Sequence, residues 1–189
     1  MKPEMVEKVY IGLGSNLGDG KKILREAWNS LGRIAGIRLD RLSSPYMSAP
    51  VDMKSQHWFT NAVGSLSVAL SPLELLKTLM DVEIEFGRIR DHQSFGYQDR
   101  SLDLDMLYYG DVVMDSPELT LPHPRIGVRL FVLAPFAELD PDFRDTVSGE
   151  TIAVMEQRLR TGMQAGGNKK QEIVRGRWDL QPPGFGSDR

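Results

Sequence analysis

The chain has no cysteine among its 189 residues. That absence excludes a disulfide framework, a thiolate metal site and a cysteine nucleophile. The sequence also has no run that approaches the ~18 consecutive apolar residues of a membrane-spanning helix. Its first residues, MKPEMVEK, lack the apolar core of a secretory signal peptide. We therefore expect a cytoplasmic protein that has no membrane partner.

The chain also lacks a large excess of positive or negative charge. The chain carries 23 basic and 26 acidic residues, a net charge of −3, so nothing favours a nucleic-acid partner. With 41% hydrophobic and 26% charged residues, the composition is that of an ordinary globular protein. The length suits one well-buried domain and is short for two. We expect a monomer or a weak homodimer that acts on small molecules.

The end of the chain differs in character from the rest. From Thr161 onward, glycines, a lysine pair and the stretch Pro182-Pro183-Gly184 leave no periodic pattern of apolar residues. We therefore predict one domain over residues 1–160 and a flexible C-terminal extension over residues 161–189. Trp178 is a candidate to anchor that extension on the body of the protein or on a partner.

The rest of the chain predicts an alternation of strands and helices. Strands are predicted at 9–13, 38–44, 59–69 and 102–109, with a loop at 45–57. Asp19 and Ser71 are the N-cap residues of two predicted helices, and Ser71 to Glu74 form a capping box. The order strand, helix, strand, strand, helix, strand fits an α+β protein with helices packed on one antiparallel sheet.

The most informative stretch is Arg100-Ser101-Leu102-Asp103-Leu104-Asp105, at the start of the last predicted strand. Side chains in a strand alternate between faces, so Asp103 and Asp105 share one face, roughly 7 Å apart. At an effective dielectric constant of about 20, their repulsion costs on the order of 2 kcal/mol. A divalent cation such as Mg²⁺ would offset that cost. The alternative is an exposed strand face that carries two solvated acids.

Glu83 is placed unusually within the second predicted helix. At 100° per residue it falls in the centre of the apolar stripe, close to Leu76 and Leu79. A carboxylate that faces inward must find a partner. An internal ion pair with Arg88 or Arg90 is favoured over a direct catalytic role. A clamp that orients a catalytic arginine would satisfy both interpretations.

Basic side chains are dense on both sides of the two acids. They are Arg88, Arg90, Arg100, His123, Arg125 and Arg129. Guanidinium groups suit phosphate oxygens, and a histidine can donate to them too. Each of these residues alone is more often a surface charge, but together with the two acids they indicate a polyphosphate site. His123 lies between two prolines, and such a stiff loop suits a ligand contact.

Two further patterns leave alternatives open. Phe59, Asn61 and Phe131 are either ordinary core residues or a slot in which aromatic rings stack on a planar heterocycle while the amide binds its edge. The segment Gly12-Leu13-Gly14-Ser15-Asn16 completes neither the dinucleotide-binding pattern nor a P-loop. It is interpreted as a tight turn whose glycines permit close approach of a ligand.

Taken together, the motifs resemble the 6-hydroxymethyl-7,8-dihydropterin pyrophosphokinase family of folate biosynthesis. The resemblance covers Val9 to Asp142 and rests on motifs that occur in this order: Gly14-Ser15-Asn16, Ser43-Ser44-x-Tyr46, Ser48-x-Pro50, Phe59-x-Asn61-Ala62, Gly87-Arg88-x-Arg90, Arg100-x-Leu102-Asp103-Leu104-Asp105 and Leu121-Pro122-His123-Pro124-Arg125-x-x-x-Arg129-x-Phe131. It implies a ferredoxin-like three-layer sandwich with a mainly antiparallel central sheet. It also implies transfer of diphosphate from MgATP to the pterin hydroxymethyl group, with release of AMP.

The resemblance also implies roles for individual residues. The catalytic set would be Arg88, Arg100, Asp103 and Asp105, with both aspartates holding two Mg²⁺ ions. The pterin would contact Ser48, Val51, Phe59, Asn61 and Phe131. The nucleotide would contact Glu83, Arg90, His123 and Arg129. No residue is an evident general base, which leaves a metal-activated hydroxyl as the hypothesis.

Two other functions remain open on the residues alone. One is a different metal-dependent nucleotidyltransferase that carries an Asp-x-Asp pair on a similar sheet. The other is a non-catalytic ferredoxin-like module that binds RNA, against which the net acidity and the absence of a basic aromatic sheet face both argue.

Overall fold

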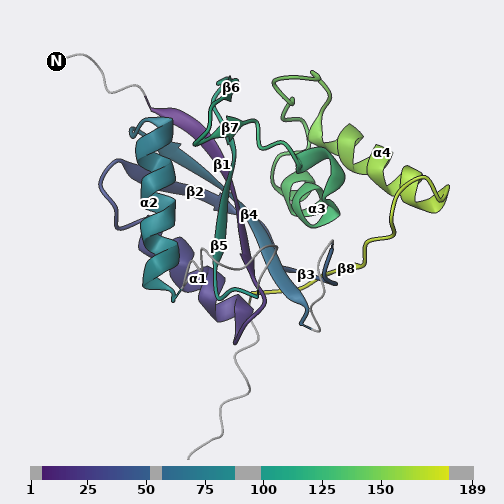
Figure 1. Ribbon diagram of the computed structural model, residues 1–189, viewed down its shortest axis with the longest axis horizontal. Helices are drawn as coiled ribbons and strands as arrows, with labels where there is room; N and C mark the ends of the chain where they lie inside the picture. The colour runs from purple at the N-terminus through teal and green to yellow at the C-terminus, as the bar shows by residue number, and fades with distance from the viewer. Residues whose placement is uncertain (1–5, 52–56, 88–98, 179–189) are drawn as a thin grey trace, which may run out of the picture.

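The computed structural model describes residues 6–51, 57–87 and 99–178. Its main sheet has the strand order β5-β1-β4-β3-β8, with β2 also paired to β4 (Figure 1). The strands of this sheet are β1 (Glu7–Ser15), β2 (Ile37–Leu42), β3 (Tyr46–Ser48), β4 (Phe59–Val68), β5 (Asp103–Tyr109) and β8 (Ile173–Arg175). A separate two-stranded sheet is formed by β6 (Met114–Asp115) and β7 (Thr120–Leu121).

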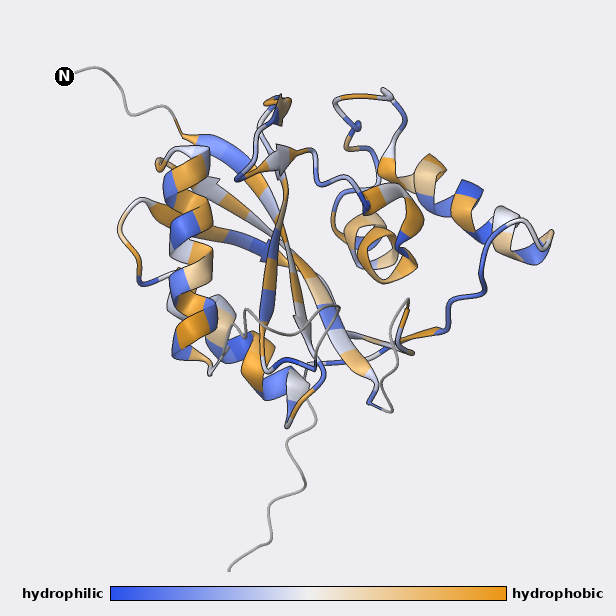
Figure 2. Cartoon of the chain, viewed as in Figure 1, coloured by the Kyte–Doolittle hydropathy of each residue, from blue (hydrophilic) through white to orange (hydrophobic). Residues whose placement is uncertain are grey.

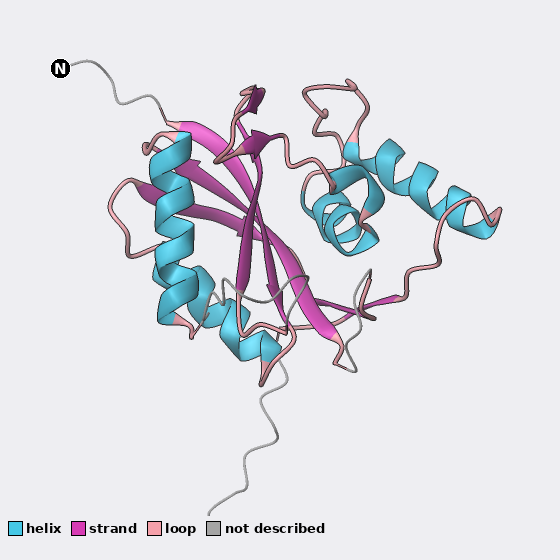
Figure 3. Cartoon of the chain, in the orientation of Figure 1, coloured by secondary structure: helices cyan, strands magenta, loops and turns pink. Residues whose placement is uncertain are grey.

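Helices cover both faces of the main sheet (Figures 1 and 3). They are α1 (Gly20–Leu31), α2 (Pro72–Glu85), α3 (Leu130–Leu139) and α4 (Ile152–Gln164), with a short 3-10 helix η1 (Ile126–Val128) before α3. The helices α1 and α2 lie on one face, and α3 lies on the other with α4 packed against it. Every pairing in the main sheet is antiparallel. The predicted α+β class is therefore confirmed.

The alternation of side chains along β1 builds a core on each face of the sheet. Val9, Ile11 and Leu13 are buried with α1 and α2, whereas Tyr10 is buried with α3 and α4. The apolar character of α3, visible in Figure 2, follows from its position between the sheet and α4. Pro135 lies inside this helix.

The long predicted strand at 59–69 is confirmed as β4, which organises the sheet. It pairs with β1 from Thr60 to Val68 on one side. On the other side it pairs with β3 and then with β2 in succession. Since β1 and β2 both run antiparallel to β4, they run parallel to each other. Parallel strands need a crossover connection, and α1 supplies it.

The predicted helix starts are confirmed in atomic detail. The Asp19 side chain accepts a hydrogen bond from the backbone N–H of Lys22. At α2, the Ser71 side chain accepts from the Glu74 N–H, and the Glu74 carboxylate accepts from the Ser71 N–H at 2.8 Å. Each capping bond satisfies an N–H group that the helix itself leaves unpaired.

The predicted loop at 45–57 needs a correction. Tyr46–Ser48 form β3, because their backbone groups pair with β4 on one side and with β8 on the other. A strand of three residues carries too little periodicity to be recognised from sequence. Within the same predicted loop, residues 52–56 lie outside the described residues.

The predicted flexible extension from Thr161 also needs a correction in its first part. The helix α4 continues to Gln164, and Ile173–Arg175 add the strand β8 to the sheet. The indole N–H of Trp178 donates to the backbone oxygen of Ser43 at 2.8 Å, which anchors this residue on the body of the protein. Residues 179–189 lie outside the described residues.

No helix in the described ranges is both long and apolar enough to cross a membrane.

Gly64 on β4 gives a test of how closely α1 packs on the sheet. A Cβ atom at this position would overlap the six-membered ring of Trp28. We expect Gly64→Ala to lower the free energy of unfolding by about 1–3 kcal/mol, because overpacking a dense core forces side chains out of their rotamers. Urea denaturation with an unchanged m-value would measure the loss.

Gly167→Ala is the matched control for that substitution. A Cβ there would meet its nearest atom, the backbone oxygen of Gly162, at an ordinary 3.6 Å, so its urea midpoint should equal that of the parent protein. Equal midpoints for all three proteins would contradict tight packing of Trp28 on Gly64.

Candidate active site

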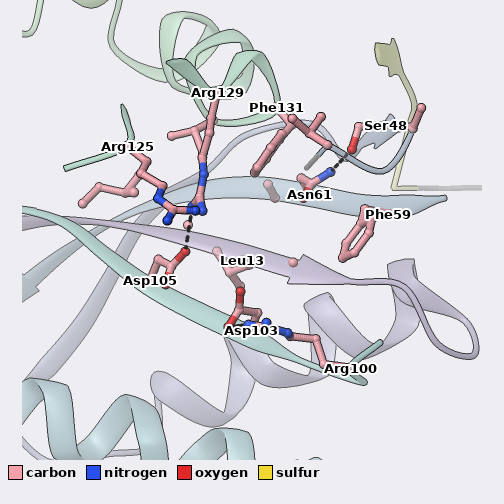
Figure 4. Close-up of a pocket in the computed structure, with 17 residues that line it drawn as sticks. Leu13, Ser48, Phe59, Asn61, Arg100, Asp103, Asp105, Arg125, Arg129 and Phe131 are labelled. Atoms are coloured by element: carbon pink, nitrogen blue, oxygen red, sulfur yellow. Dashed lines mark hydrogen bonds and ion pairs between the residues drawn. The ribbon is translucent and has the colours of Figure 1, made fainter. Parts of the chain in front are cut away.

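A pocket opens to solvent on the face of the sheet that carries α3 (Figure 4). Its floor is formed by β1, β4 and β5, and its walls by β3 with the chain that follows it and by the start of α3. The residues that line it are Gly12, Leu13, Gly14, Ser48, Ala49, Val51, Phe59, Asn61, Ala62, Arg100, Asp103, Asp105, Leu107, Arg125, Arg129, Phe131 and Val132.

Glycines on β1 leave room for the two acids of β5. In the register of this strand pair, Gly12 lies opposite Asp105 and Gly14 lies opposite Asp103. A Cβ added to either glycine would stand 3.9 Å from the Cβ of the facing aspartate. The predicted tight turn is therefore wrong for Gly12 and Gly14, which lie within β1 and form the floor of the pocket. The predicted close approach of a ligand to these glycines stays a prediction.

Asp103 and Asp105 point into the pocket from the same face of β5, as the alternation predicted (Figure 4). Each carboxylate meets an arginine. The Arg100 guanidinium donates to Asp103 Oδ1 at 2.6 Å, and Arg129 Nη1 lies 3.5 Å from Asp105 Oδ2. The arginines reach the acids from opposite sides, one from the chain before β5 and one from the start of α3.

Asn16 fixes the backbone from which Arg100 extends. Its side-chain oxygen accepts from the Arg100 N–H at 2.8 Å, and its amide group donates to Asp99 Oδ1 at 2.5 Å. Its own N–H donates to the Arg100 carbonyl oxygen at 3.2 Å. Buried at the end of β1, Asn16 therefore ties the turn after β1 to the chain that enters β5.

His123 faces Asp105 as a neutral hydrogen-bond donor. Its Nδ1 accepts from the Arg125 N–H at 3.1 Å, which leaves the ring proton on Nε2, 4.0 Å from Asp105 Oδ2. Burial lowers the pKa of His123 to about 4, and the charge of Arg129 acts in the same direction. Near neutral pH this side chain therefore offers an N–H group and no positive charge.

Asp105 is poised to gain a proton or a cation. Burial raises the pKa of its carboxyl, the charge of Asp103 adds to that rise, and the result is a pKa of about 6. The charge of Arg129 opposes the rise without cancelling it. Asp105, with the second carboxylate of Asp103 beside it, is a donor set suited to a bound cation.

The other end of the pocket is apolar with one amide at its centre. In the view of Figure 4, Asn61 lies between the rings of Phe59 and Phe131. The Asn61 amide donates to Ser48 Oγ at 3.0 Å, and its oxygen lies 3.5 Å from the position a Gly14 Cβ would take, at the pocket floor. The structure thus places the residues of the predicted slot in one pocket, which Val51 also lines.

Glu83 accepts a backbone hydrogen bond that the sequence pattern did not predict. It is buried at 2% exposure, and its carboxylate accepts from the Leu104 N–H of β5 at 2.8 Å. It does not line the pocket, so its predicted contact with the nucleotide stays a prediction. Arg88 and Arg90, the predicted partners of Glu83, lie outside the described residues.

The sequence patterns did not predict two residues as site residues: Asn16, which holds the backbone of Arg100 without lining the pocket, and Arg125. Asn16 carries only the signal of a polar residue after a strand, because its partners lie more than 80 positions away. Arg125 was noted among the basic residues, and it lines the pocket. Within the described ranges, no group of three or more acidic, histidine or cysteine side chains is arranged to hold a metal ion.

The raised pKa of Asp105 predicts a specific dependence of stability on pH in metal-free protein. Between about pH 4 and pH 6 the folded state binds more protons at this site than the unfolded state, so this carboxyl lowers stability as pH rises through that window. We expect Asp105→Asn to be more stable than the parent above pH 6 and to lose that advantage near pH 4. Urea denaturation in EDTA across this range measures both; a constant difference would contradict the raised pKa.

Comparison with known proteins agrees with this geometry. The family model described as 7,8-dihydro-6-hydroxymethylpterin-pyrophosphokinase (HPPK) matches residues 10–141. A 2-amino-4-hydroxy-6-hydroxymethyldihydropteridine pyrophosphokinase of Synechocystis sp. is 37% identical over 180 residues, which cover 91% of this chain and 90% of that protein. The enzyme of the same name from Pseudomonas aeruginosa is 39% identical over 140 residues, covering 74% of this chain and 85% of that one.

Solved structures show the same fold at much lower identity. The HPPK-DHPS protein of Plasmodium falciparum superposes with a TM-score of 0.70 at 13% identity over 87% of this chain. The superposition covers 47% of that solved chain, so this chain spans about half its length. The matched residues include both aspartates of β5 and the walls of the pocket. The chain therefore belongs to the 7,8-dihydro-6-hydroxymethylpterin pyrophosphokinase family.

Proposed function

We propose that the pocket above β1, β4 and β5 carries out the pyrophosphokinase reaction of folate biosynthesis, with ATP as diphosphate donor and 6-hydroxymethyl-7,8-dihydropterin as acceptor. One observation carries the assignment. The aspartate pair of β5 faces two arginines at one end of a pocket whose other end is an aromatic slot around a buried amide. A polyphosphate and a planar heterocycle would thus meet in one cavity.

The phosphate end would bind the nucleotide through fixed cationic and neutral donors. Arg100 and Arg129 now neutralise Asp103 and Asp105. On binding of MgATP, phosphate oxygens would replace the aspartates as partners of the two guanidinium groups, since bidentate donors suit phosphate oxygens. His123 would add its Nε2 N–H, and Arg125 stands at the same wall. Arg88, Arg90 and Glu83 stay candidates from the family resemblance.

The carboxylates released by that exchange would hold Mg²⁺, two ions by analogy with the family. Their oxygens are the ligands Mg²⁺ prefers, and water and phosphate oxygens would complete its coordination. The raised pKa of Asp105 supports this assignment, because a cation between the acids relieves their repulsion. Bound metal would neutralise phosphate charge and acidify the acceptor hydroxyl.

The apolar end would bind the pterin. Phe59 and Phe131 would stack on the ring system, and the Asn61 amide would hydrogen-bond its edge. The Asn61 amide is already oriented by its bond to Ser48 Oγ. Backbone groups near Ser48 and Val51 would complete the recognition of the ring edge.

The reaction is then mainly a matter of positioning. The pterin hydroxymethyl oxygen attacks the β-phosphorus of ATP, the bond from that phosphorus to the α–β bridging oxygen breaks, and AMP leaves while the hydroxyl proton passes to solvent. Arg100 and Arg129 would stabilise charge on the transferring group. The slot would hold the acceptor oxygen near the β-phosphorus, so that the reaction no longer depends on a chance encounter of two molecules.

The strand order supports a finer description of the fold and of the protein's setting. The sequence β1-α1-β2-β4-α2-β5 with spatial order β5-β1-β4-β2 corresponds to a ferredoxin-like sheet, to which α3 and α4 add the third layer. A cytoplasmic monomer or weak homodimer is consistent with this proposal, as is the absence of a nucleic-acid partner.

Product analysis tests the proposed reaction directly. Protein, ATP, Mg²⁺ and 6-hydroxymethyl-7,8-dihydropterin should yield AMP and the pterin diphosphate in equal amounts, and EDTA should stop both. Release of inorganic pyrophosphate in place of AMP would mean nucleotidyl transfer and would overturn the assignment.

Asp105→Ala should reduce AMP formation by about three or more orders of magnitude, because it removes a predicted metal ligand from the site of charge transfer. The variant should stay folded, since no buried apolar group is lost. Asp111→Ala, at an exposed position just after β5, is the matched control and should retain full activity. A melting curve that showed Asp105→Ala unfolded at the assay temperature would make Asp105 a structural residue instead.

A further inference from the structure

Gln171 holds the backbone on both sides of Arg129. Its side-chain oxygen accepts from the Leu130 N–H at 2.9 Å, and its amide group donates to the Val128 carbonyl oxygen at 2.7 Å. These two backbone groups flank Arg129 directly. One side chain, from a segment beyond the region that matches the family model, thus fixes the chain at the point where Arg129 enters the pocket.

The start of α3 requires such a partner. Its N-cap residue is Arg129, which has extended backbone angles of φ −114° and ψ 102° and makes no capping hydrogen bond with its side chain. Most helices place Ser, Thr, Asp or Asn here, whose oxygen accepts from the first free N–H groups. A guanidinium group has no acceptor. Gln171 supplies the missing acceptor, while the Arg129 side chain extends into the pocket and lies beside Asp105.

The groups that depend on this anchor belong to both ends of the pocket. The Arg129 guanidinium lies 3.5 Å from the Asp105 carboxylate at the phosphate end. It also lies over the ring of Phe131, 5.5 Å from the ring centre, at the pterin end. The Arg129 side chain is only 12% exposed, so its direction is set by the backbone and its packing.

Gln171 is itself tied to the opposite wall of the pocket. The next residue, Glu172, accepts the Ala49 N–H at 3.1 Å through its carbonyl oxygen. Ile173 then pairs with Ser48 in the β3–β8 register. A single short segment therefore joins the start of α3 to the strand that carries Ser48.

We propose that Gln171 is a positioning residue of this pocket, which orients Arg129 for the nucleotide and Phe131 for the pterin. The identity of the two ligands rests on the proposed function. The residue acts through Arg129 and the first turn of α3 and does not itself touch the substrates.

Gln171→Met tests the proposal, because methionine keeps the length of the side chain and removes both hydrogen bonds. Calorimetric titration with a non-hydrolysable ATP analogue and Mg²⁺ should show binding weakened on the order of tenfold, the loss expected for one or two net hydrogen bonds. A second titration with 6-hydroxymethylpterin should show a weaker complex as well. Glu172→Ala is the matched control, since Glu172 contributes its backbone carbonyl and its exposed carboxylate only approaches Lys170; its affinities should equal the parent's.

A double-mutant cycle separates positioning from a general structural role. In an Arg129→Ala background, Gln171→Met should have almost no further effect on nucleotide affinity, because the residue through which it acts is gone. An equal loss of affinity in both backgrounds would overturn the proposal, as would parental affinities in Gln171→Met alone.

Hydrogen exchange tests the anchor without any ligand. The Leu130 amide should exchange about tenfold faster in Gln171→Met, since its acceptor is lost. Unchanged exchange at Leu130 would refute the anchor whatever the protein binds. Failure of the parent protein to bind the ATP analogue would refute the proposed function and leave this test of Gln171 intact.

Discussion

The pocket depends on two carboxylates that are held side by side despite their repulsion. Strand pairing makes this arrangement possible, because each aspartate of β5 lies opposite a glycine of β1 and meets no side chain across the strands. The electrostatic cost is limited by arginines that approach from two different parts of the chain. The acids, the glycine floor and the arginines therefore form one unit, in which the pKa of Asp105 depends on the charges of Asp103, Arg129 and Arg100.

Local patterns in the sequence were sufficient to predict the elements and much of the site. The alternation in β5 placed Asp103 and Asp105 on one face, and the capping box fixed the start of α2. The inward direction of Glu83 also followed from helical spacing. Each of these predictions concerns neighbours within a few residues, where backbone geometry alone decides which side chains share a face.

The contacts that the sequence did not reveal all join distant segments. The hydrogen bond that Glu83 accepts from a backbone N–H of β5 was not predicted. Its predicted ion pair with Arg88 or Arg90 stays a prediction, because those arginines lie outside the described residues. The segment after α4 was expected to be flexible for want of an apolar pattern, but residues 173–175 pair with β3. In both cases the partner is a peptide group, which every residue presents alike. Sequence patterns cannot indicate such a contact, because the partner is a backbone group and its residue type carries no information about it.

The bond between Glu83 and Leu104 has a consequence for the behaviour of the protein at high concentration. As the terminal strand of the sheet, β5 would present free peptide groups to another molecule. Glu83 occupies one of these groups, and the N–H of His123 occupies another at the carbonyl of Leu107. At the opposite border, β8 is only three residues long and bears Arg175. The β5 border of the sheet and the β8 end of the other border are thereby protected against edge-to-edge aggregation.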